Sequence, residues 1–263
     1  MAQRIGIAGK GGVGKSTLAG TLARLLARRG KKVLAVDIDP SPSLASAVGV
    51  PENERKNLVP LSQMLDLIEE RTGVRPGSSY GQMFRLNPKV DDLVEEYGII
   101  AKDGVRLIVL GTIDVGGSGC FCPENALLKR LLKHLVLDRG EVLIMDMEAG
   151  VEHLGRGTAE GVDVLVIVVE PGRKSIETAE RIRKLAVDVG ITKIVAVLNK
   201  SLGEDDFTRS KLAEIGIEMI GSIPYMQCMI EADVKDVPPI DHEDCSEIVS
   251  AIEELEKNLG LAG

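Results

Sequence analysis

The glycine-rich run GKGGVGKS at residues 9–16 constrains the fold of this chain more than any other segment. It matches the pattern G-x-x-x-x-G-K-[ST], follows an apolar strand-like run and opens a helix-like run, which is the context that the motif requires. Glycines let such a loop wrap closely around phosphate, and the following helix adds partial positive charge. We predict that Lys15 contacts the β- and γ-phosphates of a nucleotide and that the Ser16 hydroxyl ligates Mg²⁺. The predicted nucleotide-binding residues of the loop are Gly9, Lys10, Gly11, Gly12, Val13, Gly14, Lys15, Ser16 and Thr17.

Short aliphatic runs alternate with helical patterns along nearly the whole chain. Strands are predicted at residues 4–8, 32–37, 105–110, 142–146, 164–170, 194–199 and 218–223, and helices at 16–29, 126–137, 175–190, 207–215 and 246–259. The strand runs are mostly continuous rather than alternating, as in parallel strands that are covered on both faces. We therefore predict a doubly wound α/β fold of the P-loop NTPase type, with about seven or eight mostly parallel strands and helices on both faces.

Residues 51–104 interrupt this rhythm because they contain no clean strand pattern. Leu61, Met64, Leu65 and Ile68 recur at helical spacing, and residues 91–97 form a second helical candidate. We interpret this segment as a helical insertion on the sheet, so that residues 1–263 form a single P-loop domain.

Composition and charge exclude several classes of protein. The chain carries 32 basic and 40 acidic residues, a net charge of −8, whereas binding to duplex DNA requires a basic face. Its apolar runs are far shorter than a bilayer span, and its first residues lack the features of a signal peptide. Four cysteines are too few for a disulfide scaffold. We expect a soluble, cytoplasmic protein with reduced thiols that binds neither nucleic acid nor a membrane.

Two carboxylates follow predicted strands. Asp39 lies in VDIDPSPSL after the second strand, and Asp146 ends the strand VLIMD. A carboxylate that follows a buried strand beside a phosphate-binding loop is suited to hold Mg²⁺, directly or through water. Gly150, in DMEAG, gives the next loop the freedom to approach the terminal phosphate, so residues 147–157 are expected to respond to the nucleotide. The predicted Mg²⁺ site comprises Ser16, Asp39 and Asp146.

The identity of the base is predicted from the strand that ends in Asn199-Lys200-Ser201-Leu202. Guanine-reading enzymes of this broad group use N-K-x-D, whose aspartate accepts hydrogen bonds from the base. Leu202 occupies that position and cannot accept them, and unpaired buried donors are costly. We therefore expect ATP and ADP rather than guanine nucleotides.

Cys120 and Cys122 form a C-x-C pair in a loop rich in glycine. Residues two apart in an extended segment point to the same side, so the two thiolates can chelate one metal ion. Two chains related by a two-fold axis would provide four thiolates, a set that suits Zn²⁺, Ni²⁺ or an iron–sulfur cluster. Two ordinary loop cysteines remain the alternative, and Cys228 and Cys245 are each expected to stand alone.

The loop resembles the deviant Walker A motif of the MinD/ParA/nitrogenase-iron-protein class of dimeric ATPases, because a second lysine, Lys10, stands near its start. The resemblance implies a homodimer in which Lys10 reaches the phosphates of the partner subunit and acts like an arginine finger. It also implies that Asp39 orients the attacking water, so the predicted catalytic residues are Lys10, Lys15 and Asp39. Asn199, Pro224 and Tyr225 would frame the adenine.

The chain as a whole, over roughly residues 1–258, resembles the accessory ATPases that insert nickel into carbon monoxide dehydrogenase. The matching features are the deviant loop, D-I-D-P, the C-x-C pair and DMEAGVEHLGRGT at residues 146–158. This resemblance implies Ni²⁺ or Zn²⁺ held between Cys120 and Cys122 of two chains, with carbon monoxide dehydrogenase or a related nickel enzyme as client. Two departures are the absence of a His-rich tail and the unassigned segment 51–104.

Two other functions compete with this interpretation. The first is a MinD/ParA-type positioning ATPase, which would bind a membrane or DNA. A membrane-binding version should end in a basic amphipathic helix, whereas SEIVSAIEELEKNLGLAG contains four Glu and one Lys. A DNA-binding version needs a basic surface patch, and the short basic clusters of this chain are typical of solvated helix faces. An electron-transfer ATPase resembling the nitrogenase iron protein would take cluster ligands from two separate loops, and DMEAGVEHLG contains no cysteine. A ligand or coupling role for Glu152 and His153 stays open beside ordinary solvation or capping. We interpret His242, in IDHEDCSE, as a neighbour of a helix cap.

Overall fold

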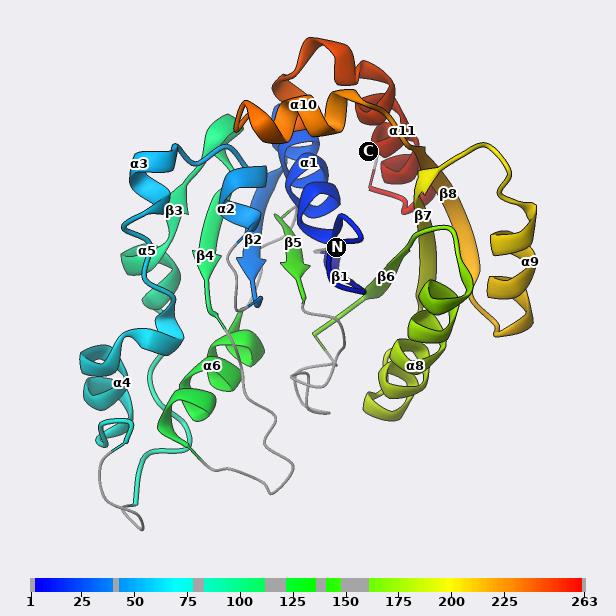
Figure 1. Ribbon diagram of the computed structural model, residues 1–263. Helices are drawn as coiled ribbons and strands as arrows, with labels where there is room; N and C mark the ends of the chain where they lie inside the picture. Colours follow the sequence, from blue (N-terminus) through cyan, green and yellow to red (C-terminus); the bar gives the residue numbers. More distant parts are fainter. Residues whose placement is uncertain are drawn as a thin grey trace.

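The computed structural model describes residues 3–39, 43–77, 83–111, 122–135, 141–147 and 161–261. Within these residues eight strands form one sheet in the order β3-β4-β2-β5-β1-β6-β7-β8 (Figure 1). Every neighbouring pair is parallel except β3 and β4. The strands are β1 (Gln3–Gly9), β2 (Lys32–Asp37), β3 (Ile99–Ile100), β4 (Arg106–Val109), β5 (Glu141–Asp146), β6 (Val164–Val169), β7 (Ile194–Ser201) and β8 (Glu218–Pro224). The predicted fold class is confirmed.

Helices cover both faces of this sheet (Figure 1). Alternate strand residues face opposite sides, so Ile5 and Ile7 of β1 pack in one apolar core and Ala8 packs in the other. The first core is completed by α1 (Lys15–Arg28), α2 (Leu44–Ala47), α10 (Cys228–Val234) and α11 (Ser246–Asn258). The second is completed by α4 (Leu65–Thr72), α5 (Leu93–Tyr97), α6 (Pro123–His134), α8 (Arg173–Val189) and α9 (Asp206–Glu214). Short 3₁₀ helices span Leu61–Gln63, Lys102–Gly104, Pro239–Asp241 and Glu243–Cys245, and α3 (Glu52–Arg55) buries no residue.

The segment 51–104 differs from its prediction in two ways. The apolar residues 61–68 do not form one helix, because Met64 has a non-helical backbone (φ −82°, ψ 76°) that separates Leu61–Gln63 from α4. The segment also contributes β3, which pairs antiparallel with β4 and extends the sheet. A strand of two residues is too short to produce a recognisable alternation in the sequence. Helix α6 begins earlier than predicted because Pro123 occupies its first turn, a position where its missing N–H costs nothing.

Arg24 of α1 joins three parts of the chain inside the protein. Its side chain is only 1% exposed, and it donates to Asp103 at 2.7 Å and to both carboxylate oxygens of Asp241 at 2.6 and 2.8 Å. Burial alone would lower the pKa of Arg24, but its hydrogen bonds to Asp241 and Asp103 raise it. Burial would likewise raise the pKa of Asp241, yet hydrogen bonds from Arg24 and Lys102 lower it to about 2. This cluster fastens α1 to two of the 3₁₀ helices.

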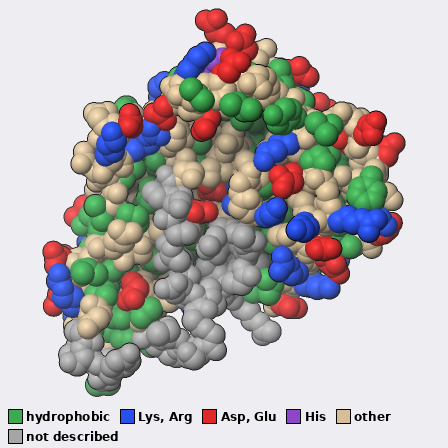
Figure 2. Space-filling model, in the orientation of Figure 1, with side chains coloured by type: hydrophobic (Ala, Val, Ile, Leu, Met, Phe, Trp, Pro, Cys, Tyr) green, Lys and Arg blue, Asp and Glu red, His purple; other side chains and the backbone are tan. Residues whose placement is uncertain are grey.

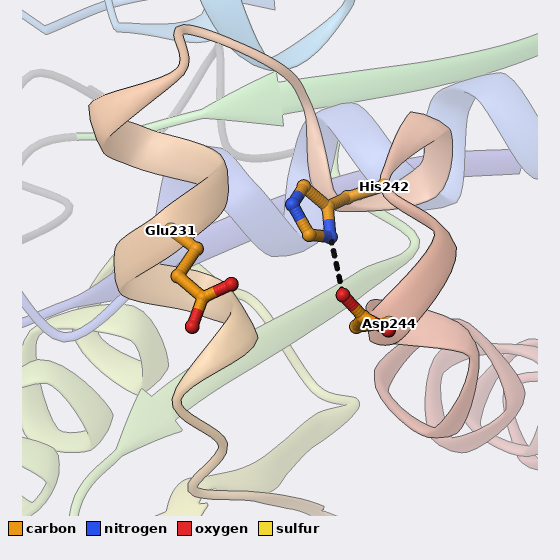
Figure 3. Close-up of side chains that lie close together, drawn as sticks. All are labelled: Glu231, His242 and Asp244. Carbon is orange, nitrogen blue, oxygen red and sulfur yellow. Dashed lines mark ion pairs between the residues drawn. The ribbon is translucent and has the colours of Figure 1, made fainter.

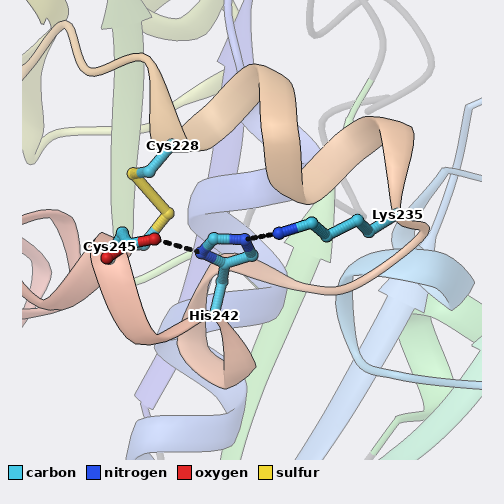
Figure 4. Close-up of a disulfide and its surroundings, with 5 residues drawn as sticks. Cys228, Lys235, His242 and Cys245 are labelled. Atoms are coloured by element: carbon cyan, nitrogen blue, oxygen red, sulfur yellow. Dashed lines mark hydrogen bonds and ion pairs between the residues drawn. A yellow bond between two sulfur atoms is a disulfide. The ribbon is translucent and has the colours of Figure 1, made fainter.

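Cys228 and Cys245 form a disulfide, which corrects the expectation that each stands alone with a reduced thiol (Figure 4). Cys228 begins α10 and Cys245 ends a 3₁₀ helix; their Cα atoms lie 5.7 Å apart and both side chains are buried. The two residues are 17 positions apart in the sequence. The two cysteines meet only because the chain folds back after α10. No local sequence pattern therefore predicts that they pair.

Removing this disulfide is expected to lower the free energy of unfolding by about 3 kcal/mol, because the unfolded chain regains the freedom of the closed loop. The measurement is urea unfolding of the wild type and of the variant Cys228→Ser/Cys245→Ser, each with and without reductant. Reductant should shift the wild type to the midpoint of the variant and leave the variant unchanged. Four titratable thiols in urea without reductant would contradict the assignment.

None of the described helices is both long enough and apolar enough to cross a membrane.

Candidate functional site

The phosphate-binding loop leaves the carboxyl end of β1 and enters α1. Gly9 has a positive φ of 151°, and a Cβ at this position would collide with the backbone oxygen of Val168 in β6. Gly14, with φ 96°, is the residue from which α1 starts, and Leu18 donates its N–H to the Gly14 carbonyl at 3.0 Å. Both positions therefore require glycine. The remaining loop residues include exposed Gly11 and Gly12, buried Val13 and Lys15, and half-buried Ser16 and Thr17 in the first turn of α1.

The end of β7 supports this loop from the side. Asn199 Nδ2 donates to the Val13 carbonyl at 2.7 Å, and Lys200 Nζ donates to the Gly12 carbonyl at 2.9 Å. A Cβ on Gly14 would collide with the Asn199 amide nitrogen, so the loop and Asn199 are fitted to each other. The structure thus gives Asn199 a supporting role in the loop, while its predicted contact with adenine stays a prediction.

Buried carboxylates meet where β2 and β5 end beside the loop. Asp37 pairs in register with Asp146, and both side chains are 0% exposed. Asp37 accepts the backbone N–H of Asp39 and of Leu44, each at 3.1 Å, so it holds the start of the segment that leads into α2. Burial, followed by the charge of Asp146, raises the pKa of Asp37 to about 7. Sequence reasoning assigned a role to Asp39 and missed this one.

Asp146 has the properties of a cation ligand. Neither of its buried oxygens accepts a hydrogen bond of normal geometry from the described residues. Burial raises the pKa of Asp146 to about 6; the Ser16 hydroxyl and the Lys15 charge lower it by less, although Ser16 lies outside normal hydrogen-bond geometry. A buried carboxylate that accepts no hydrogen bond of normal geometry from the described residues, beside a hydroxyl, is an oxygen donor set that suits Mg²⁺. Ser16 and Asp146 therefore fit the predicted ion, and Asp39 is close enough that its charge affects the pKa of Asp146.

A cleft of about 460 Å³ opens beside the loop. It is lined by Gly12, Gly14 and Thr17 on one side and by Asn199, Pro224 and Tyr225 on another, so all three predicted adenine residues reach one space next to the loop. Met229 and Ile230 of α10 give it an apolar wall, and hydrophobic side chains gather over this helix in Figure 2. Leu202 is 76% exposed and lines a neighbouring hollow instead. The cleft has the size and mixed character of a site for a nucleotide base.

Residues 5–240 match the family described as the CobQ/CobB/MinD/ParA nucleotide binding domain. The chain belongs to this family.

Relatives agree with this assignment. An uncharacterized ATP-binding protein of Methanocaldococcus jannaschii is 49% identical over 232 residues, which cover 88% of each chain. The carbon monoxide dehydrogenase accessory protein CooC of Rhodospirillum rubrum is 45% identical over 230 residues, 88% of this chain and 86% of CooC. A chain of the MinC:MinD cell division protein complex of Aquifex aeolicus has the same fold, with a TM-score of 0.67 at 22% identity, covering 100% of this chain and 97% of that one. This CobQ/CobB/MinD/ParA protein is an ATPase.

The two lysines of the loop have different surroundings in this CobQ/CobB/MinD/ParA protein. Lys15 is 6% exposed and its charge acts on Asp146. Lys10 is 47% exposed, and its Nζ lies 3.5 Å from Glu170 Oε1. Lys200 Nζ lies 3.3 Å from the other oxygen of the same carboxylate. Glu170, which follows β6, therefore forms ion pairs with both Lys10 and Lys200. The sequence placed residue 170 at the end of a strand but did not predict these ion pairs.

The Ni²⁺ or Zn²⁺ site predicted at Cys120 and Cys122 falls only partly within the described residues. Cys122 is the residue before α6 and is partly buried. Cys120 lies outside the described residues, as do Gly150, Glu152 and His153 of the loop after Asp146. Leu110, at the end of the described segment that precedes the C-x-C pair in the sequence, donates its N–H to the Asp37 carbonyl at 2.8 Å, so the chain leaves β4 beside Asp37.

Proposed function

We propose that this protein is a homodimeric ATPase that helps to load nickel into carbon monoxide dehydrogenase, or into a related nickel enzyme, in the cytoplasm. The observation that carries the proposal is the 45% identity with CooC, a carbon monoxide dehydrogenase accessory protein, over 88% of this chain. The second lysine of the loop, Lys10, and the pair Cys120 and Cys122 add to it.

The cargo metal, Ni²⁺ or Zn²⁺, would lie between Cys120 and Cys122 of two chains. Four thiolates form a closed set that suits either ion. Two contacts support a link between this metal and the nucleotide. The chain enters the C-x-C loop from β4 beside Asp37, and it leaves that loop into α6, which buries Leu127, Leu128 and Leu131 in the core. A movement of Asp37 at the nucleotide site would therefore act on the start of the C-x-C loop, while α6 holds the end of that loop in the core.

Hydrolysis would use groups that the fold already holds at the carboxyl ends of β1, β2 and β5. Lys15 and the backbone of the loop would bind the phosphates, and Asp39, positioned by Asp37, would orient the attacking water. Ser16 and Asp146 would hold Mg²⁺, with Asp39 nearby, and the ion would neutralise charge on the β- and γ-phosphate oxygens. Lys10 would leave Glu170 and cross to the phosphates of the partner subunit, which would draw the two chains face to face.

The proposal is tested by Ni²⁺ binding to the reduced, metal-free protein, with determination of mass, in the absence and presence of ADP or ATP. We expect one Ni²⁺ shared by two chains, and we expect Cys120→Ser to lose this metal while it still binds nucleotide. The variant Cys228→Ser/Cys245→Ser is the matched control and should keep the metal, because those residues lie in a different part of the fold.

The same experiment separates the alternatives. Full Ni²⁺ stoichiometry in Cys120→Ser would refute the ligand assignment. Absence of Ni²⁺ binding in every nucleotide state would favour a positioning ATPase, and an iron–sulfur absorption spectrum would favour electron transfer. Against a membrane-positioning role, the apolar residues Ile248, Ile252 and Leu255 of α11 are buried in the core of the protein rather than available to a bilayer.

A further inference from the structure

We propose that Glu231, His242 and Asp244 form a second metal site, which binds a divalent transition-metal cation such as Zn²⁺ and is separate from both the nucleotide site and the C-x-C pair. Glu231 projects from α10, His242 precedes the 3₁₀ helix Glu243–Cys245, and Asp244 lies within that helix (Figure 3). One ligand atom from each residue lies within 4.8 Å of the other two.

The imidazole of His242 is the strongest reason for this site. Its side chain is 7% exposed, and its Nδ1 atom is buried without a hydrogen-bond partner among the described residues. Nδ1 faces Asp244, whose Oδ2 atom lies 4.0 Å away, too far for a hydrogen bond (Figure 3). A buried polar nitrogen that lacks a partner is costly, and a cation between the ring and the carboxylates would satisfy it. His242, predicted to neighbour a helix cap, is itself the cap residue between the 3₁₀ helices Pro239–Asp241 and Glu243–Cys245, and that position leaves this atom unexplained.

The triad has the chemistry and the mobility that an ion of the Zn²⁺ class requires. Such ions take imidazole nitrogen and carboxylate oxygen at about 2.0–2.2 Å, so ligand atoms around a tetrahedral ion lie roughly 3.4 Å apart. The ligand atoms, which lie within 4.8 Å of one another, can approach to this distance because Asp244 is 76% exposed and Glu231 is exposed, so both can rotate toward the ring. Two carboxylates balance the charge of the ion, and water would complete its coordination.

The scaffold that carries the ligands is fixed by covalent and ionic contacts. The Cys228–Cys245 disulfide joins the start of α10 to the end of the 3₁₀ helix, which are the two elements that bear Glu231 and Asp244 (Figure 4). On the other side of His242, Asp241 is held by Arg24. The backbone spacing of the three ligands is therefore set before any ion arrives, which lowers the entropic cost of binding.

Lys235 competes with a metal ion for the imidazole ring of His242. Its Nζ atom lies 3.1 Å from His242 Nε2 (Figure 4). An ammonium group can only donate, so Nε2 accepts and the neutral ring carries its proton on Nδ1. A cation at Nδ1 displaces that proton, the ring must then carry its proton on Nε2, and Lys235 must withdraw. Because Lys235 is exposed, it can do so, but its presence weakens metal binding.

The test is titration of the intact chain with ZnCl₂ by calorimetry, in the background Cys120→Ser/Cys122→Ser, which removes the C-x-C pair. We expect one Zn²⁺ per chain in this background. Both His242→Gln and Glu231→Gln should weaken binding by at least ~100-fold, as expected for lost metal ligands. Lys235→Met should tighten binding roughly tenfold, because it removes a nearby positive charge. Glu243→Gln, which changes an exposed carboxylate outside the triad, should leave binding unchanged.

Two measurements keep the outcome interpretable. Each variant should retain the melting temperature and nucleotide binding of the background, and Glu231→Gln serves if His242→Gln folds poorly, because Glu231 is exposed. Co²⁺ in place of Zn²⁺ should give d–d absorption without thiolate charge-transfer bands. Absence of Zn²⁺ binding in the background, or Zn²⁺ binding by both ligand variants that is as tight as in the background, would overturn the proposal. Neither result would affect the C-x-C site, which this background lacks.

Discussion

Replacement of Lys10 by alanine is expected to lower ATP turnover by about 10³–10⁵-fold, the range known for a cation supplied in trans to a phosphoryl transfer. The side chain is 47% exposed and lies 3.5 Å from Glu170, so it is held at the surface rather than in its own phosphate site. Nucleotide-driven dimerisation should weaken as well. Steady-state hydrolysis and mass determination with ATP measure both effects, and Lys56→Ala, a change of a 70% exposed lysine that directly follows α3, is the matched control.

Mixed dimers distinguish action on the partner from action within one chain. Lys10→Ala and Lys15→Ala should each be inactive alone, the second because Lys15 is the buried lysine of the phosphate-binding loop and is predicted to contact the phosphates. When they are mixed, the Lys10→Ala chain keeps Lys15 and receives Lys10 from its partner. Random pairing then restores about a quarter of the wild-type activity, since half the dimers are mixed and each has one complete site. A mixture as inactive as its components, or a Lys10→Ala protein with normal turnover, would exclude the trans role.

Replacement of Arg24 by leucine is expected to lower the free energy of unfolding by about 3–5 kcal/mol, because it leaves two partly buried carboxylates without their main partner. Arg24 is 1% exposed, while Asp103 and Asp241 are 23% and 20% exposed. Arg28 and Lys102 still reach these carboxylates, so the lower end of the range is expected. Urea unfolding measures the loss. Arg75→Leu, which removes an exposed ion-pairing arginine, should leave the stability nearly unchanged, because solvent screens exposed ion pairs.

The same variant has a pH signature with a definite sign. The folded pKa of Asp241 is about 2, below its ordinary value of 3.8, so its ionised form stabilises the fold. That contribution is complete above pH 4 and is lost as the pH falls toward 2. The difference in stability between the wild type and Arg24→Leu should therefore narrow below pH 4. A difference that stays constant across this range would mean that the loss comes from packing alone.

Local sequence determined most of the strands, the five longest described helices and the phosphate-binding loop of this protein. The loop at residues 9–16 is contiguous, and its glycines are required by backbone geometry that a few neighbouring residues impose. The strands were predictable because each is covered on both faces and therefore consists of consecutive apolar residues. The fold class could then be predicted, because alternating strands and helices can be connected in only a few sheet topologies. Only β3, with two residues, was too short to leave such a pattern.

Tertiary structure decided the contacts between side chains that are distant in sequence. The register of β2 and β5 sets Asp37 beside Asp146, and Asn199 reaches the Val13 carbonyl across 186 residues. The bond between Cys228 and Cys245 and the unpartnered nitrogen of His242 likewise depend on where the chain returns after α10. Periodicity and local motifs indicate which face of an element is buried, but not which distant side chain packs against that face. These tertiary contacts are set by strand order, register and loop path, which only the folded chain defines.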